Sequence, residues 1–585
     1  MNTNSENKEK CWRTIFRQTK QKPDRENWAA QLSVYFSYVF FFCLPGLVCN
    51  AIPMHEASVV TPVASNNLWN CLEGNPNRRF ICDGFRYGFH LGVTSVPDVK
   101  RKPACVSPPS LTSQDPFTQK INAELIAKRV LGPFKSLPAH VIVSPLYVIS
   151  KSTPGKYRLI HNLSSPNGNS INESIDTDMK SVSYCNVLDV AMFLASNPDS
   201  KCFMAKVDLK DAYRCVPVHP DDWKFLGMCY KGHYFIDTCL PMGCASSCNI
   251  FSTISDALSF AFQRENGDCK CFNYLDDFLI VAKSKSRCSQ ALACFMDMLE
   301  CCGFPISHDK TIRPHTRVEF LGLDIDSETW TFMVPDSKKL KTLASIADFV
   351  SKPTQRVRTI QQLVGKLTFL CTTFLAGRCL LASLHEQLRG VLSNEGWYRK
   401  RVTRGVKDDL MLWSSFLESN SGRPFRFLFP MAEPSLCIET DASGSYGFGA
   451  VMDGRWFSGQ WLCGWWSEQH ITLLELYPVY VALQLWSSEI SNNTILVRTD
   501  NSALVDILTN FYSRNHLINK LVKKCVFTLM SCNTVLRVTH IPGKDNVIPD
   551  RLSRGLCCTS LLDMASRACL PPAIQPSAVK DMLSA

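Results

Sequence analysis

The chain has 585 residues, of which 45% are hydrophobic, enough to fill the cores of roughly three or four domains, which excludes a disordered or fibrous protein. Its 63 Lys and Arg against 52 Asp and Glu give a formal net charge of +11, which suits a polyanionic partner and is equally compatible with ordinary surface charge. The 28 cysteines lie in apolar sequence without the paired spacing of a zinc site, so we expect reduced thiols in an intracellular protein, in the cytoplasm, the nucleus or both.

Residues 1–119 contain an apolar run at residues 32–48 that follows a leader with Lys and Arg and resembles a signal anchor. Pro45 and Gly46 interrupt this run, and its apolar core is shorter than the ~20 residues that a spanning helix needs. We expect a buried segment here, with a membrane anchor as the alternative. The rest of residues 1–119 has no motif with a chemical interpretation, so the role of this region is unknown.

An α/β region is expected over residues 120–330. Residues 121–134 predict a short amphipathic helix that ends at Gly132 and Pro133, and residues 140–150 alternate like a strand. Short β-rich runs then alternate with helical segments, which is typical of a sheet with helices packed on one face.

The remaining sequence divides by its pattern into three further parts. The expected fold class is a multidomain combination of α/β and α+β architecture. The three parts are a mostly helical and basic region at 331–428, a second α/β unit at 432–556, and a tail or linker at 557–585.

Two adjacent acids, Asp276 and Asp277, lie between two apolar runs and predict a hairpin with carboxylates at its tip. Adjacent carboxylates repel each other and are costly to desolvate, so they suggest a cation such as Mg²⁺, although a simple Asp-Asp turn is an alternative. Asp208 ends another apolar run, at a strand end that can face this hairpin. Two metal ions held by shared carboxylates are what an in-line displacement at phosphorus needs.

The segments KVDLKDAY, LPMGCASSCNIF and NYLDD occur in this order and resemble the successive palm motifs of reverse transcriptases. KSTPGKYRLIHNLSSPNGNSIN resembles the finger motif that precedes them. Together with GFRYGFHLGV upstream and EFLGLDID downstream, the sequence of the finger motif most resembles that of retrotransposons of the DIRS-like tyrosine-recombinase class. The resemblance implies a right-hand polymerase, with fingers and palm in residues 120–330 and a thumb and connection in residues 331–428.

The resemblance also implies roles for charged residues. Asp208, Asp276 and Asp277 match the catalytic acids that bind two Mg²⁺ ions, with Mn²⁺ as the alternative metal. Lys151 and Arg158 match the finger cations that hold the incoming triphosphate, a role suited to charge-assisted phosphate contacts. Two surface cations in a basic loop are the alternative interpretation of this pair.

Three further positions match substrate contacts of the same family. Tyr213 falls where the family has an aromatic steric gate under the sugar, and a core tyrosine is the alternative. Gly243 is expected to allow close approach of the backbone to template or nucleotide. Met242 stands where many retroviral enzymes carry Gln, so the contacts to the nucleotide differ from the family pattern here.

A second set of acids follows in residues 432–556. Asp441 lies where an apolar strand ends at a Gly/Ser turn, and Glu475 lies among leucines in the first turns of a helix. Asp500 ends another apolar strand, where it also suits a helix cap, and Asp550 opens a short helix. Each signal alone is explained as well by a turn, a cap or a solvated side chain.

In combination, the order Asp, Glu, Asp, Asp and the phrases TDAS, LLEL, RTDNSA and HIPGKDNVIPDRLSR resemble ribonuclease H. This resemblance implies that Asp441, Glu475, Asp500 and Asp550 bind two Mg²⁺ ions and that the site hydrolyses the RNA strand of an RNA:DNA hybrid. His540 lies ten residues before Asp550, but its alignment places it in a strand, so we expect a structural role for it.

The sequence therefore predicts a reverse transcriptase with ribonuclease H activity. Its expected partners are an RNA template, a DNA primer, the RNA:DNA hybrid and dNTPs. Protease, integrase-zinc and tyrosine-recombinase signatures are absent from the sequence, so we expect precursor cleavage and DNA integration to need other proteins or a longer polyprotein. Other element-encoded proteins, such as a capsid-like protein or a recombinase, are therefore possible partners.

Two alternatives stay open. One is a catalytically inactive, domesticated copy of an element that binds nucleic acid or scaffolds a ribonucleoprotein, and the other is a hybrid nuclease with a dead polymerase. Decay should erode the acids first, because a core survives without them and two-metal catalysis does not. All seven candidate acids are present, which favours an active enzyme.

Overall fold

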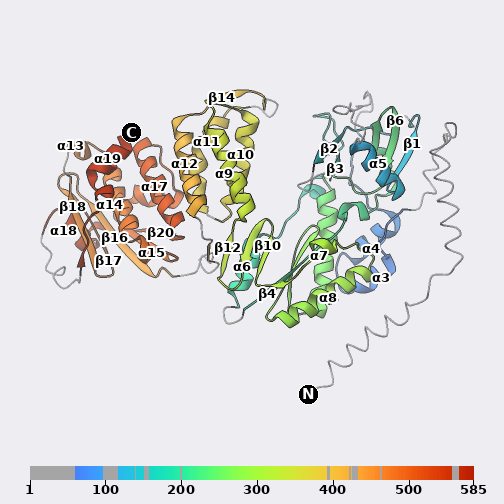
Figure 1. The fold of residues 1–585 in the computed structure, drawn as a ribbon, viewed down its shortest axis with the longest axis horizontal. Helices are drawn as coiled ribbons and strands as arrows, with labels where there is room; N and C mark the ends of the chain where they lie inside the picture. The colour runs from blue at the N-terminus through green and yellow to red at the C-terminus, as the bar shows by residue number, and fades with distance from the viewer. Residues whose placement is uncertain are drawn as a thin grey trace, which may run out of the picture. The chain divides into compact units, whose positions relative to one another are not determined.

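The chain folds as two compact units in the computed structural model (Figure 1). The smaller unit is drawn from residues 1–61, 83–180 and 213–247, and the larger from residues 62–82, 181–212 and 248–585. The apolar run at 32–48 lies outside the described residues, and none of the described helices has the length and apolar character that a membrane crossing requires. The structure describes residues 59–96, 116–138, 140–150, 157–197, 201–373, 375–391, 396–419, 423–424, 433–461, 464–556 and 566–584.

The smaller unit contains an antiparallel three-stranded sheet of order β1-β6-β5 and a separate β2–β3 hairpin. Phe117, Ile121 and Leu125 lie one helical turn apart, so they form an apolar stripe on α5 that packs with the sheet residues Val130 and Phe235. The bounds are α4 (Arg78–Tyr87), α5 (Pro116–Ile126), β1 (Val130–Phe134), β2 (Leu146–Ser150), β3 (Tyr157–His161), η1 (Asp178–Lys180), η3 (Pro220–Phe225), β5 (Gly227–Tyr230) and β6 (His233–Asp237).

The helix expected over residues 121–134 is wrong beyond Ile126. Lys128 adopts a left-handed backbone conformation with φ 57°, which ends the helix, and strand β1 begins at Val130. Val130 pairs with Asp237 of β6, far along the chain. Long-range strand pairing therefore overrides a local helical pattern.

The first sheet of the larger unit is antiparallel, with strand order β7-β8-β4-β9. The hairpin expected around the two adjacent acids is confirmed, because β7 and β8 pair directly across the turn. Helix α8 packs on β4 and β8. The bounds are α3 (Ser65–Cys71), α6 (Val187–Ala195), β4 (Phe203–Asp208), η2 (Ala212–Cys215), α7 (Ser247–Glu265), β7 (Lys270–Tyr274), β8 (Asp277–Ala282), α8 (Lys285–Cys301), η4 (His308–Lys310) and β9 (Ile312–His315).

A small four-stranded sheet of order β10-β11-β12-β15 is followed mainly by helices, together with a two-stranded ribbon, β13–β14. Each longer helix buries an apolar stripe; in α10 it includes Ile360, Leu363 and Leu367. The bounds are β10 (Arg317–Phe320), β11 (Leu323–Asp326), β12 (Thr331–Met333), α9 (Asp336–Val350), β13 (Thr354–Arg356), α10 (Val357–Leu370), η5 (Leu375–Leu381), α11 (Ala382–Leu388), β14 (Arg399–Arg401), α12 (Arg404–Ser419) and β15 (Arg423–Pro424).

The C-terminal sheet has six strands in the order β20-β19-β16-β17-β18-β21. Strands β16, β19 and β20 are parallel neighbours, whereas β17 is antiparallel to both β16 and β18. Helix α14 is buried over most of its circumference, as its nearly continuous apolar sequence requires. The bounds are β16 (Leu436–Ala442), β17 (Gly447–Met452), β18 (Arg455–Gln460), α13 (Gly464–Ser467), α14 (Ile471–Leu485), α15 (Ser487–Ile490), β19 (Thr494–Thr499), α16 (Ser502–Asn510), α17 (His516–Ser531), β20 (Val535–His540) and α18 (Val547–Ser553).

Residues 566–584, expected to belong to a tail or linker, contribute to this same fold. β21 (Ser566–Arg567) adds a parallel edge strand beside β18, and α19 (Pro576–Ser584) buries Val579 and Leu583 in the core. The Trp466 indole donates a hydrogen bond to the Pro576 carbonyl over 3.0 Å, and the Tyr477 hydroxyl donates one to the Ile574 carbonyl over 2.6 Å.

A buried ion pair joins the helical region to the C-terminal sheet unit. The Lys523 ammonium on α17 lies 2.6 Å and 2.8 Å from the two carboxylate oxygens of Asp409 on α12. It also donates to the Ser383 hydroxyl over 3.2 Å. The Asp409 side chain is only 1% exposed and that of Lys523 13%, so water does little to screen the pair.

We expect Asp409→Ala to destabilise the protein by about 3–5 kcal/mol, because it leaves the Lys523 ammonium buried and unpaired. The double variant Asp409→Ala/Lys523→Met should lose much less than the sum of the single changes. Urea unfolding, followed by circular dichroism, measures both. Asp348→Ala, which breaks the exposed pair between Asp348 and Lys352, is the control and should cost at most about 1 kcal/mol. A cost for Asp409→Ala as small as that of the control would contradict this role.

Candidate active sites

The first site lies at the ends of two neighbouring strands. Asp208 is the last residue of β4 and pairs in register with Asp277, the first residue of β8. Asp276 lies beside them in the turn, where its carbonyl accepts a hydrogen bond from the Leu209 amide over 3.0 Å. The fold therefore brings the three acids predicted from the sequence together at one end of the two inner strands of the sheet.

The turn that carries Asp276 and Asp277 has a constrained backbone. Leu275 has φ 53°, a left-handed conformation that costs a non-glycine residue energy and is found at sites that the surrounding structure fixes. The Ser255 hydroxyl on α7 donates to the Leu275 carbonyl over 2.7 Å. Helix α7 thus holds the turn in the conformation that presents both acids.

Two lysines that the sequence interpretation missed contact these acids. The Lys310 ammonium lies 2.6 Å from Asp208 Oδ1, and the Lys206 ammonium lies 3.0 Å from Asp277 Oδ1. Lys206 precedes Asp208 by two positions on β4, so strand alternation alone places both on one face of the sheet. Lys310 lies on η4, 102 residues after Asp208, and no local pattern points to it.

Two acids of the first site, Asp276 and Asp277, have raised pKa values. Burial raises the pKa of Asp276, and the Asp277 carboxylate raises it further. Burial also raises the pKa of Asp277, although the Lys206 ammonium opposes this effect. A cluster of buried carboxylate oxygens with raised pKa values favours binding of a hard cation, which fits Mg²⁺.

The residues expected to contact the nucleotide belong to the smaller unit, apart from Lys151, which lies outside the described residues. Arg158 is exposed on β3, opposite Ile149 in the β2–β3 hairpin. Tyr213 is half-buried in η2. The side chain of its neighbour Arg214 is only 11% exposed, and it donates hydrogen bonds to Glu124 over 3.0 Å and to Asp237 over 2.9 Å that fix this short helix.

Met242 and Gly243 lie on a loop that packs directly against β3. The Met242 carbonyl accepts a hydrogen bond from the His161 amide over 2.9 Å. Gly243 has φ +123°, and a Cβ at this position would lie 2.1 Å from the His161 carbonyl oxygen, so only glycine fits. The Asn172 amide, which the sequence interpretation missed, donates to the Gly243 carbonyl over 2.8 Å and accepts from the Ala245 amide over 2.9 Å.

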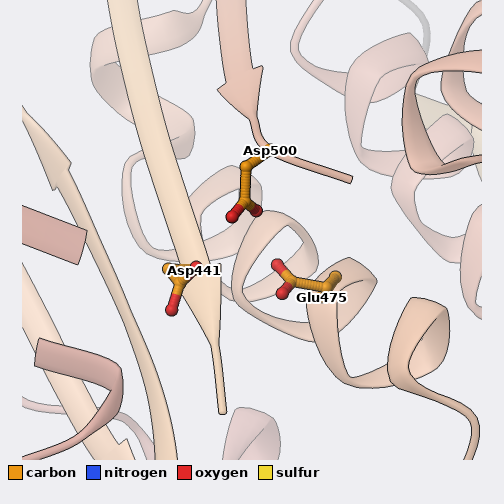
Figure 2. Close-up of side chains that lie close together, drawn as sticks. All are labelled: Asp441, Glu475 and Asp500. Carbon is orange, nitrogen blue, oxygen red and sulfur yellow. The ribbon is translucent and has the colours of Figure 1, made fainter. Parts of the chain in front are cut away.

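The second site gathers acids from two parallel strands and a helix. Figure 2 shows Asp441 on β16, Asp500 at the end of β19 and Glu475 on α14, whose carboxylate oxygens lie within 4.8 Å of one another. Asp550 on α18 is not part of this trio. It forms an ion pair with Arg554 over 2.7 Å, one helical turn further along the chain.

Burial controls ionisation in the second site. It raises the pKa of Glu475 to about 9, with further contributions from the Asp441 and Asp500 carboxylates. Burial raises the pKa of Asp441 to about 6, against the opposing effect of a hydrogen bond from Ser553 over 2.5 Å. Among the described residues, Glu475 Oε2 is buried without a hydrogen-bond partner. These three carboxylates offer clustered oxygen ligands that fit a divalent cation. Such a cation would replace the proton that the raised pKa of Glu475 favours.

The residues around Asp500 explain two neighbouring motif positions. His540 is the last residue of β20, and its Nε2 lies 3.1 Å from the Asp500 carbonyl oxygen, which places it in the strand as expected. A Cβ on Gly543 would lie 3.1 Å from Asp500 Oδ2, so the glycine leaves room beside this carboxylate. Ser553, which holds Asp441, was missed because it lies 112 residues away in sequence.

The first site lies within a stretch of sequence that matches a known protein family. Residues 149–325 match the family model described as reverse transcriptase (RNA-dependent DNA polymerase). The enzymatic polyprotein of Cauliflower mosaic virus (strain Strasbourg) is 23% identical over 471 residues, which cover 78% of this chain and 63% of that protein. The Gag-Pol polyprotein of Rous sarcoma virus subgroup B (strain Schmidt-Ruppin) is 27% identical over 262 residues, which cover 43% of this chain and 14% of that protein.

This chain thus spans 63% of the length of the caulimovirus relative. A solved structure of a foamy viral protease-reverse transcriptase in complex with dsDNA has a TM-score of 0.43 and 15% identity, with 85% of this chain and 99% of that chain covered. The same protein in complex with an RNA/DNA hybrid has a TM-score of 0.43 and 13% identity, with 90% and 67% covered. On the strength of the family match, residues 149–325 are a reverse transcriptase domain of the kind found in retroelement polyproteins.

Proposed function

We propose that this protein is an RNA-directed DNA polymerase that also hydrolyses the RNA strand of RNA:DNA hybrids. The observation that carries the proposal is the convergence of Asp208, Asp276 and Asp277 at one end of two inner strands within the reverse transcriptase domain. The proposed substrates are an RNA template, a DNA primer and dNTPs. The domain boundaries expected from the sequence, with fingers and palm, a helical thumb and connection, and a C-terminal nuclease, belong to this proposal.

In the polymerase, the three acids would hold two Mg²⁺ ions, which supply activation of the primer 3′-hydroxyl and stabilisation of the leaving pyrophosphate. Lys206 and Lys310 neutralise part of the acidic charge before a cation binds. Arg158 and Lys151 would bind the triphosphate, and Tyr213 would exclude a 2′-hydroxyl below the sugar. The Met242-Gly243 loop would line the nucleotide site through its backbone.

In the nuclease, Asp441, Glu475, Asp500 and Asp550 would hold two Mg²⁺ ions that supply an activated water and stabilise the leaving 3′-oxygen. The mixed sheet β20-β19-β16-β17-β18, with Asp441 and Asp500 at strand ends and Glu475 on α14, supports this part of the proposal. The ion pair with Arg554 keeps the Asp550 carboxylate close to α18, so a second cation has to compete with a guanidinium there.

We also propose that the element belongs to the DIRS-like class. This assignment depends on the sequence of the finger motif and of its flanking segments. A capsid-like protein and a recombinase are proposed as partners because the sequence carries no protease, integrase-zinc or tyrosine-recombinase signature. The rival function, an inactive copy that only binds nucleic acid, gives no reason for six acids to gather in two clusters of three.

We expect Asp276→Asn/Asp277→Asn to reduce primer extension on an RNA template by about 10³-fold or more, because it removes cation ligands worth several kcal/mol of barrier. Extension is followed with dNTPs and Mg²⁺ on a sequencing gel, and hybrid cleavage is followed in the same reaction. Asp268→Asn, at an exposed acid paired with Arg287, is the control and should leave synthesis unchanged. Wild-type protein that binds hybrid but neither extends nor cleaves would support the inactive-copy alternative.

We expect Glu475→Gln to abolish hybrid cleavage while primer extension persists. The same variant should stabilise the metal-free protein, because folding buries a carboxyl whose pKa rises from an ordinary value to about 9. A raised carboxyl pKa lowers stability as pH rises from about 4.5 towards 9, at most about 1.4 kcal/mol per pH unit. The gain in melting temperature in EDTA should therefore be larger at pH 8 than at pH 6.

The matched control for this experiment is Glu468→Gln, at an exposed acid on the same sheet unit. It should change neither cleavage nor the pH dependence of the melting temperature. Full cleavage by Glu475→Gln would show that Glu475 is not part of the nuclease site, whatever its effect on stability.

A further inference from the structure

Two large aromatic side chains are exposed just before strand β14. Trp397 is 74% exposed and Tyr398 is 51% exposed, with ring centroids 6.3 Å apart in an edge-to-face arrangement. Exposing such rings to water carries a free-energy cost, and in the described part of the chain neither ring is among the residues packed against the large hydrophobic core. Their position therefore suggests a role in binding.

The ribbon beside these rings is strongly cationic on its outer face. In the β13–β14 register, Arg356 pairs with Arg399 and Thr354 with Arg401, and all three arginines are exposed. Gln355 faces inward, where its amide donates to the Phe349 carbonyl over 2.8 Å. Like charges directly opposite each other destabilise a strand pair, so folding alone does not favour the Arg356–Arg399 pair.

The aromatic and basic residues lie on a fixed backbone. The Val357 amide donates to the Tyr398 carbonyl over 2.8 Å, and the Arg358 amide donates to the Gly396 carbonyl over 3.0 Å, so pairing continues past the ribbon into the start of α10. The Arg399 guanidinium donates to the Thr354 hydroxyl over 3.1 Å, which orients it along the ribbon. Figure 1 places β14 at one end of helices α10 to α12.

The sequence that contains β14 is also rich in basic residues, between the acids Glu395 and Asp408. Residues 396–407 contain five Lys or Arg residues and no Asp or Glu: Arg399, Lys400, Arg401, Arg404 and Lys407. A surface with this charge is complementary to a polyanion.

We propose that Trp397, Tyr398, Arg356, Arg399 and Arg401, named here the aromatic-arginine ribbon, bind single-stranded nucleic acid. Arginines alone suit a single strand and a duplex equally, because both present phosphates. Exposed rings favour the single strand, because bases within a duplex are already stacked on each other and an unpaired base has a free face. The occupant would be the unpaired template, so this inference rests on the proposed function and adds a site outside both acidic clusters.

The test is fluorescence anisotropy of the full chain with two probes, a labelled oligothymidylate and a blunt DNA duplex of the same length, in EDTA so that no cleavage occurs. Trp397→Ala/Tyr398→Ala should weaken single-strand binding by at least about 10-fold and change duplex binding less than about 2-fold. Trp397→Phe should retain most of the affinity, because phenylalanine still stacks. Arg399→Ala/Arg401→Ala should weaken binding of both probes and make the slope of log K against log salt concentration shallower by about 1–2, where K is the association constant.

Matched controls separate this site from general surface effects. Leu340→Ala removes a side chain that is 67% exposed on α9, and Lys201→Ala/Arg389→Ala removes two exposed charges from other ion pairs. Both should leave single-strand affinity within about 2-fold of wild type. Thermal melting verifies that every variant is folded.

Two results would overturn the inference: unchanged single-strand affinity in Trp397→Ala/Tyr398→Ala, or an equal loss for single strand and duplex. Primer extension on the wild-type chain separates the inference from the proposed function. If the wild-type chain makes no DNA but binds single strands in a way that depends on the two rings, the polymerase activity is contradicted and the role of the aromatic-arginine ribbon is supported. Active synthesis with single-strand binding indifferent to the rings would support the polymerase and contradict the ribbon.

Discussion

The burial of like charges at strand ends is the constraint on which both candidate sites depend. In each site the fold brings carboxylates together where they are partly shielded from water. Other interactions in the native structure therefore have to offset the free-energy cost of desolvating these charges. The two sites do this differently. Lys206 and Lys310 supply positive charge to the first, whereas no lysine of the described residues pairs with Glu475 in the second, and its raised pKa favours a bound proton.

This difference has consequences for the surrounding structure. A lysine can neutralise a buried carboxylate from a neighbouring element because its side chain is long. Lys310 does so from the short helix η4, where its ammonium pairs with Asp208. A protonated acid needs only a close apolar enclosure, which α14 provides because nearly every residue around Glu475 is buried. Both arrangements leave oxygen atoms that a divalent cation satisfies better than the protein does alone.

Much of the framework could be predicted from local patterns. Strand alternation and turn residues gave the β7–β8 hairpin, and the acids at the ends of β4, β16 and β19 follow directly from where apolar runs stop. What local patterns miss are partners that the fold brings from far away. Lys310, Asn172 and Ser553 have no periodic signal, and strand pairing with β6 replaced the second half of a predicted helix. Motif order placed Asp550 with the other acids, whereas its ion pair with Arg554 depends on side-chain geometry that the order does not encode.

The packing of residues 566–584 bears on how a polyprotein containing this segment can be processed. The Trp466 indole and the Tyr477 hydroxyl both depend on carbonyl acceptors in this stretch, and each buried donor left without an acceptor costs about 1–3 kcal/mol. A protease that cut just after residue 556 and released the following segment would also strip β21 from the sheet edge and Val579 and Leu583 from the core. Loss of residues 566–584 would therefore expose part of the core as well as the sheet edge at β18.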